Sequence, residues 1–327
     1  MKKLIIYPYS QDFQHIVEYR EHIAGYELSK LIVSKSYSPQ NSCQCDESSA
    51  LISTDYYSEV NKCDAVLLTL EPHLVSKEAE VARSLNKELI QPSINLNFRA
   101  FDTHYSTSLS RIGVPVIAIM GQGENTQKFE VQLGLREVFQ RMGYRVLQFG
   151  TKHYSEIFGM HCYPECNELP LWKKIIMLNK HFAQLIEETK PDVMILGVPG
   201  GMMPVNAIHH NLFGEIAIAV CEAASPDIAI VSFYENLVTD GMIEMSTKYA
   251  EGRLGSSIDY VHVSNCKMSA PVDQQTVSYL RVPNEQVVDR ISQINLSSKV
   301  FNCDIKPKAK SVYAEIIEEL QCNIDVI

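Results

Sequence analysis

Tryptophan and long runs of like charge are scarce in this sequence. One tryptophan occurs in 327 residues, and 39 acidic and 29 basic side chains are mixed along the chain to give a formal net charge of −10. A chain with this balance lacks the basic patch by which proteins hold nucleic acid. We therefore expect no nucleic-acid partner.

Long apolar runs are also missing. No stretch approaches the roughly 18 apolar residues that a membrane span requires. The N-terminal sequence MKKLIIYPYS has three apolar residues before Tyr7, too few for the apolar core of a signal peptide. The sequence predicts a cytoplasmic protein with no membrane partner.

The cysteines do not form a pattern typical of disulfide-bonded proteins. The nine cysteines are odd in number and irregular in spacing, and in a reducing compartment we expect them to be free thiols. Two of them, Cys43 and Cys45, stand in a polar stretch that is typical of a surface loop.

One segment gathers four possible metal ligands, His153, His161, Cys162 and Cys166. Their spacing fits no standard zinc pattern, and the segment is rich in aromatic residues. We expect it to be a packed loop that lines a cleft, and we predict no metal site.

Apolar runs of strand length alternate with helix-like segments throughout the chain. Strands are expected at residues 3–7, 26–33, 65–70, 116–120, 144–149, 193–196, 228–233 and 260–263. Helices are expected at 15–23, 76–86, 128–142, 172–188, 216–224, 241–252, 285–294 and 308–320. Residues 91–113 are polar and irregular. The pattern predicts an α/β protein with parallel sheets covered on both faces, divided into residues 1–105 and 106–327.

A glycine-containing turn joins the strand and the helix in VIAIMGQGENTQKFEVQLGLREVFQRMGYRV. The N–H groups of such a turn and of the helix start make an anion site. Residues 121–128 have the spacing G-x6-K, which resembles the phosphate loop of proteins like dethiobiotin synthetase. The residues expected to bind a phosphorylated ligand here are Gly121, Gly123, Glu124, Asn125, Thr126 and Lys128.

The loop departs from the usual pattern, which has Gly before the lysine and Ser or Thr after it. Gln127 and Phe129 occupy these places. The alternative is an ordinary tight turn with a solvated Lys128. Asn125 and Thr126 are suitable N-cap residues, and Glu130 with Gln132 places further polar groups at the helix start.

A second glycine-rich turn follows a strand in KPDVMILGVPGGMMP. Nucleotide hydrolysis normally needs an acid at this strand end to hold magnesium, but Gly197 stands there. Asp192 lies at the other end of the strand. The turn, with Gly197, Gly200 and Gly201, would allow close backbone approach to a ligand, or it is an ordinary tight turn.

Nearly the whole chain resembles the peptide maturation system proteins of clostridial natural-product clusters, which are encoded beside bacteriocin-like precursors and radical SAM maturases. The resemblance lies in MKKLIIYPYSQDF, GQGENTQKFEVQLGLRE, YSEIFGMH and KPDVMILGVPGGMMP. It implies a role in ribosomal-peptide (RiPP, bacteriocin) maturation, with a precursor peptide and a peptide maturase as partners.

A more remote resemblance is to two-domain proteins that join an N-terminal Rossmann-like domain to a C-terminal P-loop-NTPase-like domain. Some of these are similar to D-amino-acid N-acetyltransferases that use acetyl-CoA. The carrying segments are GVPGGMMPVN and EAASPDIAIVSFYEN. This resemblance implies the same two-domain fold here, and acetyl-CoA as a possible cofactor beside ATP and GTP.

Two hypotheses remain open. In an enzyme, Lys128 would neutralise ligand phosphate, and Glu130 or His161 would act as general base. In a scaffold the loop is a relic, and the chain binds the precursor peptide or the maturase, with a homodimer as a further possibility. A cobalamin-binding domain is disfavoured because no Asp-x-His-x-x-Gly follows a strand.

Overall fold

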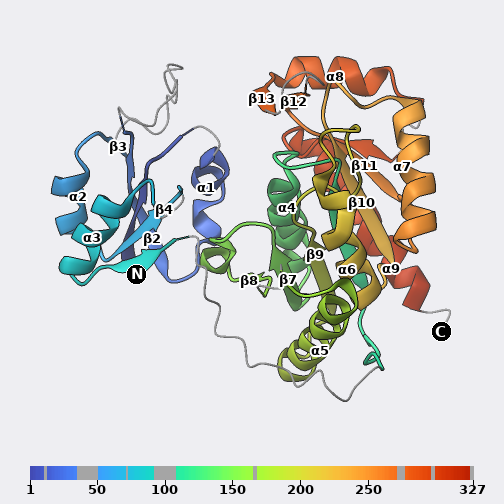
Figure 1. Ribbon diagram of the computed structural model, residues 1–327, viewed down its shortest axis with the longest axis horizontal. Coiled ribbons are helices and arrows are strands. Elements are labelled where there is room, and N and C mark those ends of the chain that lie inside the picture. The colour runs from blue at the N-terminus through green and yellow to red at the C-terminus, as the bar shows by residue number, and fades with distance from the viewer. Residues whose placement is uncertain are drawn as a thin grey trace. The chain divides into compact units, whose positions relative to one another are not determined.

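The chain forms two compact units in the computed structural model shown in Figure 1. The first comprises residues 1–97 and 152–165, and the second comprises residues 98–151 and 166–327. The structure describes residues 1–10, 13–34, 51–70, 73–91, 108–164, 168–270, 277–295 and 299–324. The boundary predicted between residues 105 and 106 lies outside these ranges.

The first unit is built on a parallel sheet with the strand order β3-β2-β1-β4-β5. Its strands are β1 (Lys2–Tyr7), β2 (Tyr26–Ile32), β3 (Ile52–Ser53), β4 (Ala65–Leu68) and β5 (Glu88–Ile90). Its helices are α1 (Gln14–Glu18), η2 (Arg20–His22), α2 (Tyr56–Lys62) and α3 (Ser76–Ser84). Buried side chains of β1 and β4, among them Ile5 and Val66, pack with Val60 of α2 and Ala79 of α3.

A later stretch of chain belongs to this first unit. Residues 152–165 hold η3 (Ser155–Phe158) and β8 (His161–Cys162). The N–H of Ala24 donates to the carbonyl oxygen of Ile157 at 2.6 Å. The ring of His15 lies 2.8 Å from the Tyr154 hydroxyl, and both side chains are buried. The sequence pattern did not predict that residues 152–165 belong to the first unit, because a short stretch of sequence does not show which sheet it will join.

The second unit has a larger parallel sheet, in which the strands run in the order β14-β11-β10-β6-β9-β7. These strands are β6 (Val116–Gly121), β7 (Val146–Gly150), β9 (Val193–Gly197), β10 (Ile228–Phe233), β11 (Tyr260–Val263) and β14 (Val300–Phe301). Its helices are α4 (Lys128–Arg141), α5 (Leu171–Thr189), η4 (Asn211–Gly214), α6 (Glu215–Ala223), α7 (Asp240–Arg253), α8 (Asn284–Ser292) and α9 (Lys306–Ile324).

Helices cover both faces of this sheet. Ile117 and Ile119 of β6 join a buried cluster with Val131 of α4 and Tyr313 of α9. Met120 points to the opposite face, because successive strand residues alternate, and its sulfur lies 4.0 Å from that of Cys221 on α6. Figure 1 shows the green helix α4 and the red helix α9 beside the strands. The predicted α/β class, with a Rossmann-like unit and a phosphate-loop-like unit, is confirmed.

An antiparallel hairpin, β12 (Cys266–Ser269) and β13 (Ser278–Arg281), completes the second unit. The buried carboxylate of Glu235 lies 3.5 Å from Lys267 of the hairpin and 3.4 Å from Arg290 of α8. This buried acid therefore ties the hairpin and α8 to the end of β10.

The described residues bear on two expectations from the sequence, which concern membrane spans and cysteines. No helix within them combines the length and the apolar content needed to cross a membrane. The six cysteines that the structure describes are free, namely Cys63, Cys162, Cys221, Cys266, Cys303 and Cys322. The other three, Cys43, Cys45 and Cys166, lie outside the described residues.

Candidate functional site

The glycine-containing turn lies at the carboxyl end of β6, in the middle of the larger parallel sheet. Open sheets of this kind bind ligands at the carboxyl ends of their strands. β6 ends at Gly121 and α4 begins at Lys128. A Cβ on Gly121 would lie 2.5 Å from the Thr126 hydroxyl, so the turn can close this tightly only around glycine.

The backbone of the turn presents a row of N–H groups. None of the N–H groups of residues 123–127 donates a hydrogen bond to another residue that the structure describes. Asn125 and Gln127 both have left-handed backbones, with φ of 56° and 57°. Alternation of right- and left-handed residues curls successive N–H groups toward one point and makes an anion-binding nest. The positive end of the α4 dipole lies at the same place, since α4 begins at Lys128.

Lys128 is buried, with 6% of its surface exposed. Its ammonium donates to the carbonyl oxygen of Gly123 at 3.1 Å and to that of Gly200. The expectation of an exposed, solvated Lys128 was wrong. The charge that the sequence predicted to meet solvent is held instead between the two glycine-rich turns, by the carbonyls of Gly123 and Gly200.

The start of α4 is capped differently from the prediction. The N-cap residue is Gln127, and its side chain makes no cap hydrogen bond to the helix. The Thr126 hydroxyl donates to the Gly123 carbonyl at 3.2 Å. The Gln127 side chain donates to Asp304 at 3.1 Å and accepts from the N–H of Asn265. Capping by Asn125 and Thr126 was therefore wrong, because the side chain of Thr126 closes the turn and the backbone of Asn125 is left-handed.

The turn after β9 meets the first turn directly. The Met202 N–H donates to the Gly121 carbonyl at 2.8 Å, and the Asn211 side-chain amide donates to the Gln122 carbonyl at 3.0 Å. A Cβ on Gly201 would lie 2.3 Å from the Asn211 amide. The structure therefore brings together the two predicted glycine-rich segments, residues 121–128 and 197–201.

The positions that normally hold magnesium do not fit a metal ion. Phe129 is 1% exposed and carries no oxygen, and Gly197 ends β9 without a carboxylate. The side chain of Gln132 fills the space beside Gly197, where a Cβ would lie 2.2 Å from the amide carbon. No group of three or more His, Cys, Asp or Glu suited to a metal occurs among the described residues. We derive no metal-dependent step at this site.

Tyr234 is a neighbour of the loop that sequence reasoning missed. It directly follows β10 and is fully buried, and its hydroxyl donates to the Glu124 carbonyl. Burial raises its pKa well above the usual value. A Cβ on Gly123 would lie 2.3 Å from the Tyr234 oxygen, which explains the second glycine of the turn. The sequence signal that could have pointed to Tyr234 is its position directly after an apolar strand.

The chain matches no protein-family model and no curated protein. Among solved structures it is similar to a DUF1611 family protein from Anabaena variabilis, at 9% identity and a TM-score of 0.59, over 98% of this chain and 99% of that one. A nucleotide-binding protein in complex with ADP from Archaeoglobus fulgidus has 14% identity and a TM-score of 0.30, over 61% and 87% of the two chains. An LAO/AO transport system kinase has 11% identity and a TM-score of 0.35, over 63% and 59%. The first likeness shows a shared fold over the full length.

The two predicted general bases lie in different units. Glu130 is half-buried in the first turn of α4, beside the loop. His161 belongs to the segment that groups with the first unit. In that segment burial lowers the pKa of His153 to about 4 and raises the pKa of Cys162 to about 11, values that suit a packed segment. Cys166 lies outside the described residues.

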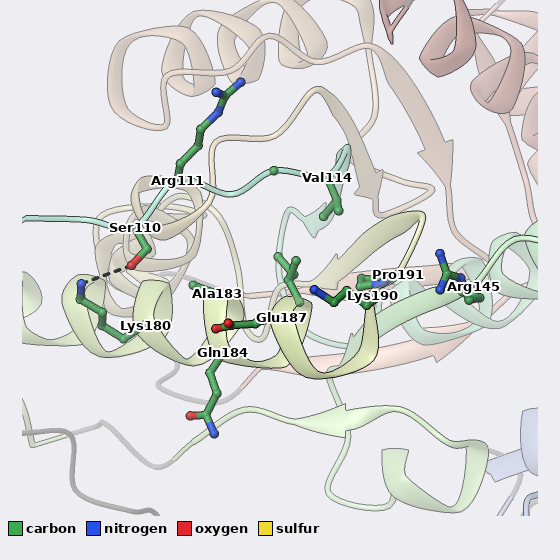
Figure 2. A pocket seen from close by; sticks show the side chains of 12 residues that line it. Ser110, Arg111, Val114, Arg145, Lys180, Ala183, Gln184, Glu187, Lys190 and Pro191 are labelled. Carbon is green, nitrogen blue, oxygen red and sulfur yellow. Dashed lines mark hydrogen bonds between the residues drawn. The ribbon is translucent and has the colours of Figure 1, made fainter.

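A cavity of about 680 Å³ opens at the opposite end of the same sheet. Figure 2 shows its lining, which includes Arg145 before β7 and Lys190 before β9, and a hydrogen bond from Lys180 to Ser110. Asp192 pairs with Arg145 at 2.9 Å, and this contact lowers the pKa of the carboxyl. The cavity lies at the amino ends of the parallel strands, away from the turn at residues 121–128.

Proposed function

We propose that the second unit binds a phosphorylated ligand at residues 121–128. The observation that carries this proposal is the row of five backbone N–H groups at residues 123–127 that have no partner among the described residues, curled at the start of α4. Backbone N–H groups in this arrangement bind phosphate oxygens. The buried ammonium of Lys128 supplies the positive charge at the same place.

The ligand we propose is a nucleotide or an acyl-CoA, both of which carry a pyrophosphate that such a loop can hold. If the protein is an enzyme, Lys128 neutralises the phosphate and Glu130, in the same unit, is the candidate general base. With acetyl-CoA the reaction would be an N-acyltransfer. His161 is a weaker candidate for the base, because it belongs to the segment of the first unit.

Calorimetric titration of the full chain with ATP, GTP and acetyl-CoA tests this proposal, each with a matched ligand that lacks phosphate. Adenosine, guanosine and S-acetylpantetheine serve as these controls. We expect at least one phosphorylated ligand to bind and its control to bind far more weakly, since the nest recognises phosphate. Equal affinity for adenosine and ATP, or no binding by any of the three, would contradict the proposal.

We further propose that this binding serves the maturation of a ribosomally made peptide, with a precursor peptide and a peptide maturase as partners. The support is the resemblance of MKKLIIYPYSQDF and YSEIFGMH to peptide maturation system proteins. A labelled bacteriocin-like precursor peptide should bind the full chain in fluorescence anisotropy. A version of the peptide with a scrambled sequence is the control, and equal binding of the two would count against this role. Binding of precursor without any phosphorylated ligand would favour the scaffold.

A further inference from the structure

A buried amide without a partner lies one helical turn beyond Lys128. Gln132 is fully buried, and neither its side-chain nitrogen nor its side-chain oxygen has a hydrogen-bond partner among the described residues. Buried amides are nearly always paired, because an unpaired one loses its bonds to water without replacement. The Gln132 amide is therefore available to bond with a ligand.

The position of this amide connects it with the phosphate site. Residues four apart share one face of a helix, so Gln132 and Lys128 lie on the same side of α4. Lys128 donates to the carbonyl oxygen of Gly200, and the Gln132 amide packs against Gly197 of the same turn. Residues 197–200 therefore contact both polar side chains. Lys128 is hydrogen-bonded there, whereas the Gln132 amide is not.

The chemistry of the amide fits a phosphate oxygen better than a metal ion. In a magnesium-dependent site the end of β9 would carry an acid, whereas this strand ends at Gly197 with the Gln132 amide beside it. The amide nitrogen is a neutral donor that can bond directly to an anionic oxygen. An acid at this position could not do so without a cation.

We propose that Gln132 is a ligand-binding residue, which donates its amide N–H to a phosphate oxygen once residues 199–201 move aside, while Val198 keeps its hydrogen bond to Ile119. A phosphate that accepts a hydrogen bond from the Lys128 ammonium would compete with the carbonyl of Gly200 and so weaken one of the bonds that hold this turn. Gly200 has a φ of 70° and Gly201 follows it, so the backbone can change conformation there at little steric cost. This inference rests on the proposed phosphate site and adds a specific contact to it.

Gln132→Met tests the inference, because methionine keeps the length of the side chain and removes both polar atoms. The matched control is Gln148→Met. The Gln148 side chain donates to the Gln132 carbonyl at 3.2 Å and accepts from Arg136 at 3.2 Å, so its amide is already paired. ATP, GTP and acetyl-CoA are titrated against the three full-length chains, and the ligand-free melting temperature of each is measured.

We expect Gln132→Met to lower the affinity for the phosphorylated ligand by about tenfold, because one hydrogen bond to a charged group is lost. The melting temperature measured without ligand should not fall. Gln148→Met should lower the melting temperature. If the parent binds and Gln132→Met binds equally well, the inference is wrong and the phosphate site stands. If Gln132→Met melts as early as Gln148→Met, the amide has a structural partner and the inference is again wrong. If the parent binds none of the three ligands, the proposed function fails and the inference with it.

Discussion

The ammonium of Lys128 donates to the carbonyl oxygen of Gly200, which lies 72 residues further along the chain. This bond joins the start of α4 to the turn after β9. It gives Lys128 two roles, because the same ammonium that would meet ligand phosphate also joins the two glycine-rich turns.

Lys128→Met should therefore reduce both stability and affinity. We expect the free energy of unfolding to fall by about 1–3 kcal/mol, because the carbonyls of Gly123 and Gly200 lose their donor. The affinity for the phosphorylated ligand should fall by about ten- to a hundredfold. Urea denaturation and calorimetry measure the two effects. Lys248→Met is the control, since Lys248 is exposed and pairs with Glu244 at the surface. If Lys128→Met binds the ligand with unchanged affinity, Lys128 does not contact the phosphate.

Ligand binding should not depend on magnesium. Phe129 and Gly197 replace the hydroxyl and the acid that usually hold the metal, so the phosphate must be neutralised by Lys128 and by N–H groups. Titrations in EDTA and in magnesium should give the same dissociation constant. Tight binding that appears only with magnesium would contradict the proposed site.

Gly197→Ala should destabilise the protein in a way that depends on Gln132. The new methyl group would lie 2.2 Å from the Gln132 amide, and crowding of this kind costs roughly 1–3 kcal/mol. In a Gln132→Ala background the methyl has room, so the same change should cost much less. A double-mutant cycle by urea denaturation measures this difference. Equal costs in both backgrounds would show that the two residues are not in contact.

The side chain and the backbone of Gln127 should have opposite effects on stability. Its side chain bonds to Asp304 and to the Asn265 N–H, whereas its φ of 57° is unfavourable for any residue other than glycine. Gln127→Ala loses the bonds and keeps the unfavourable backbone, and Gln127→Gly loses the bonds but relieves the backbone. We expect the alanine variant to be less stable than the glycine variant by about 1 kcal/mol. The reverse order in thermal unfolding would refute this account.

Stability should decline in mild acid because of His262. Burial lowers the pKa of this histidine to about 3, against about 6.5 in the unfolded chain. Its contribution is complete above pH 6.5, and it is lost as the pH falls toward 3, because only the unfolded chain takes up the proton. Between pH 7 and pH 5 this loss is about 2 kcal/mol. His262→Phe should remove that part of the pH dependence in urea denaturation, and an unchanged slope would argue against a buried neutral histidine.

Local pattern was sufficient to predict most elements of the fold. Apolar runs placed β6, β9 and β10 within one residue of their observed ends, because strands covered on both faces are almost wholly apolar. Glycine spacing likewise placed the turn at residues 121–128. The short helix α2 was missed, since it has only two buried residues, Tyr56 and Val60.

The contacts of the site were harder to predict than its location. Lysine is usually solvated, and the burial of Lys128 depends on the Gly200 carbonyl, which reaches it only through the pairing of β6 with β9. The side chain of Tyr234 packs against Gly123. Tyr234 is remote in sequence and lies near Gly123 because β10 pairs with β6. Such contacts follow from strand order, which no local pattern contains.

The return of residues 152–165 to the first unit affects the order in which the chain can fold during synthesis. His15 cannot meet Tyr154, nor Ala24 bond to Ile157, until the ribosome has passed both β6 and α4 of the second unit. Domains usually fold in turn as they emerge. Here these contacts of the N-terminal unit form only after a late segment has been made, and a fragment that ends at residue 105 would lack Tyr154, which contacts the ring of His15. Each unit is therefore encoded by two separate stretches of the gene.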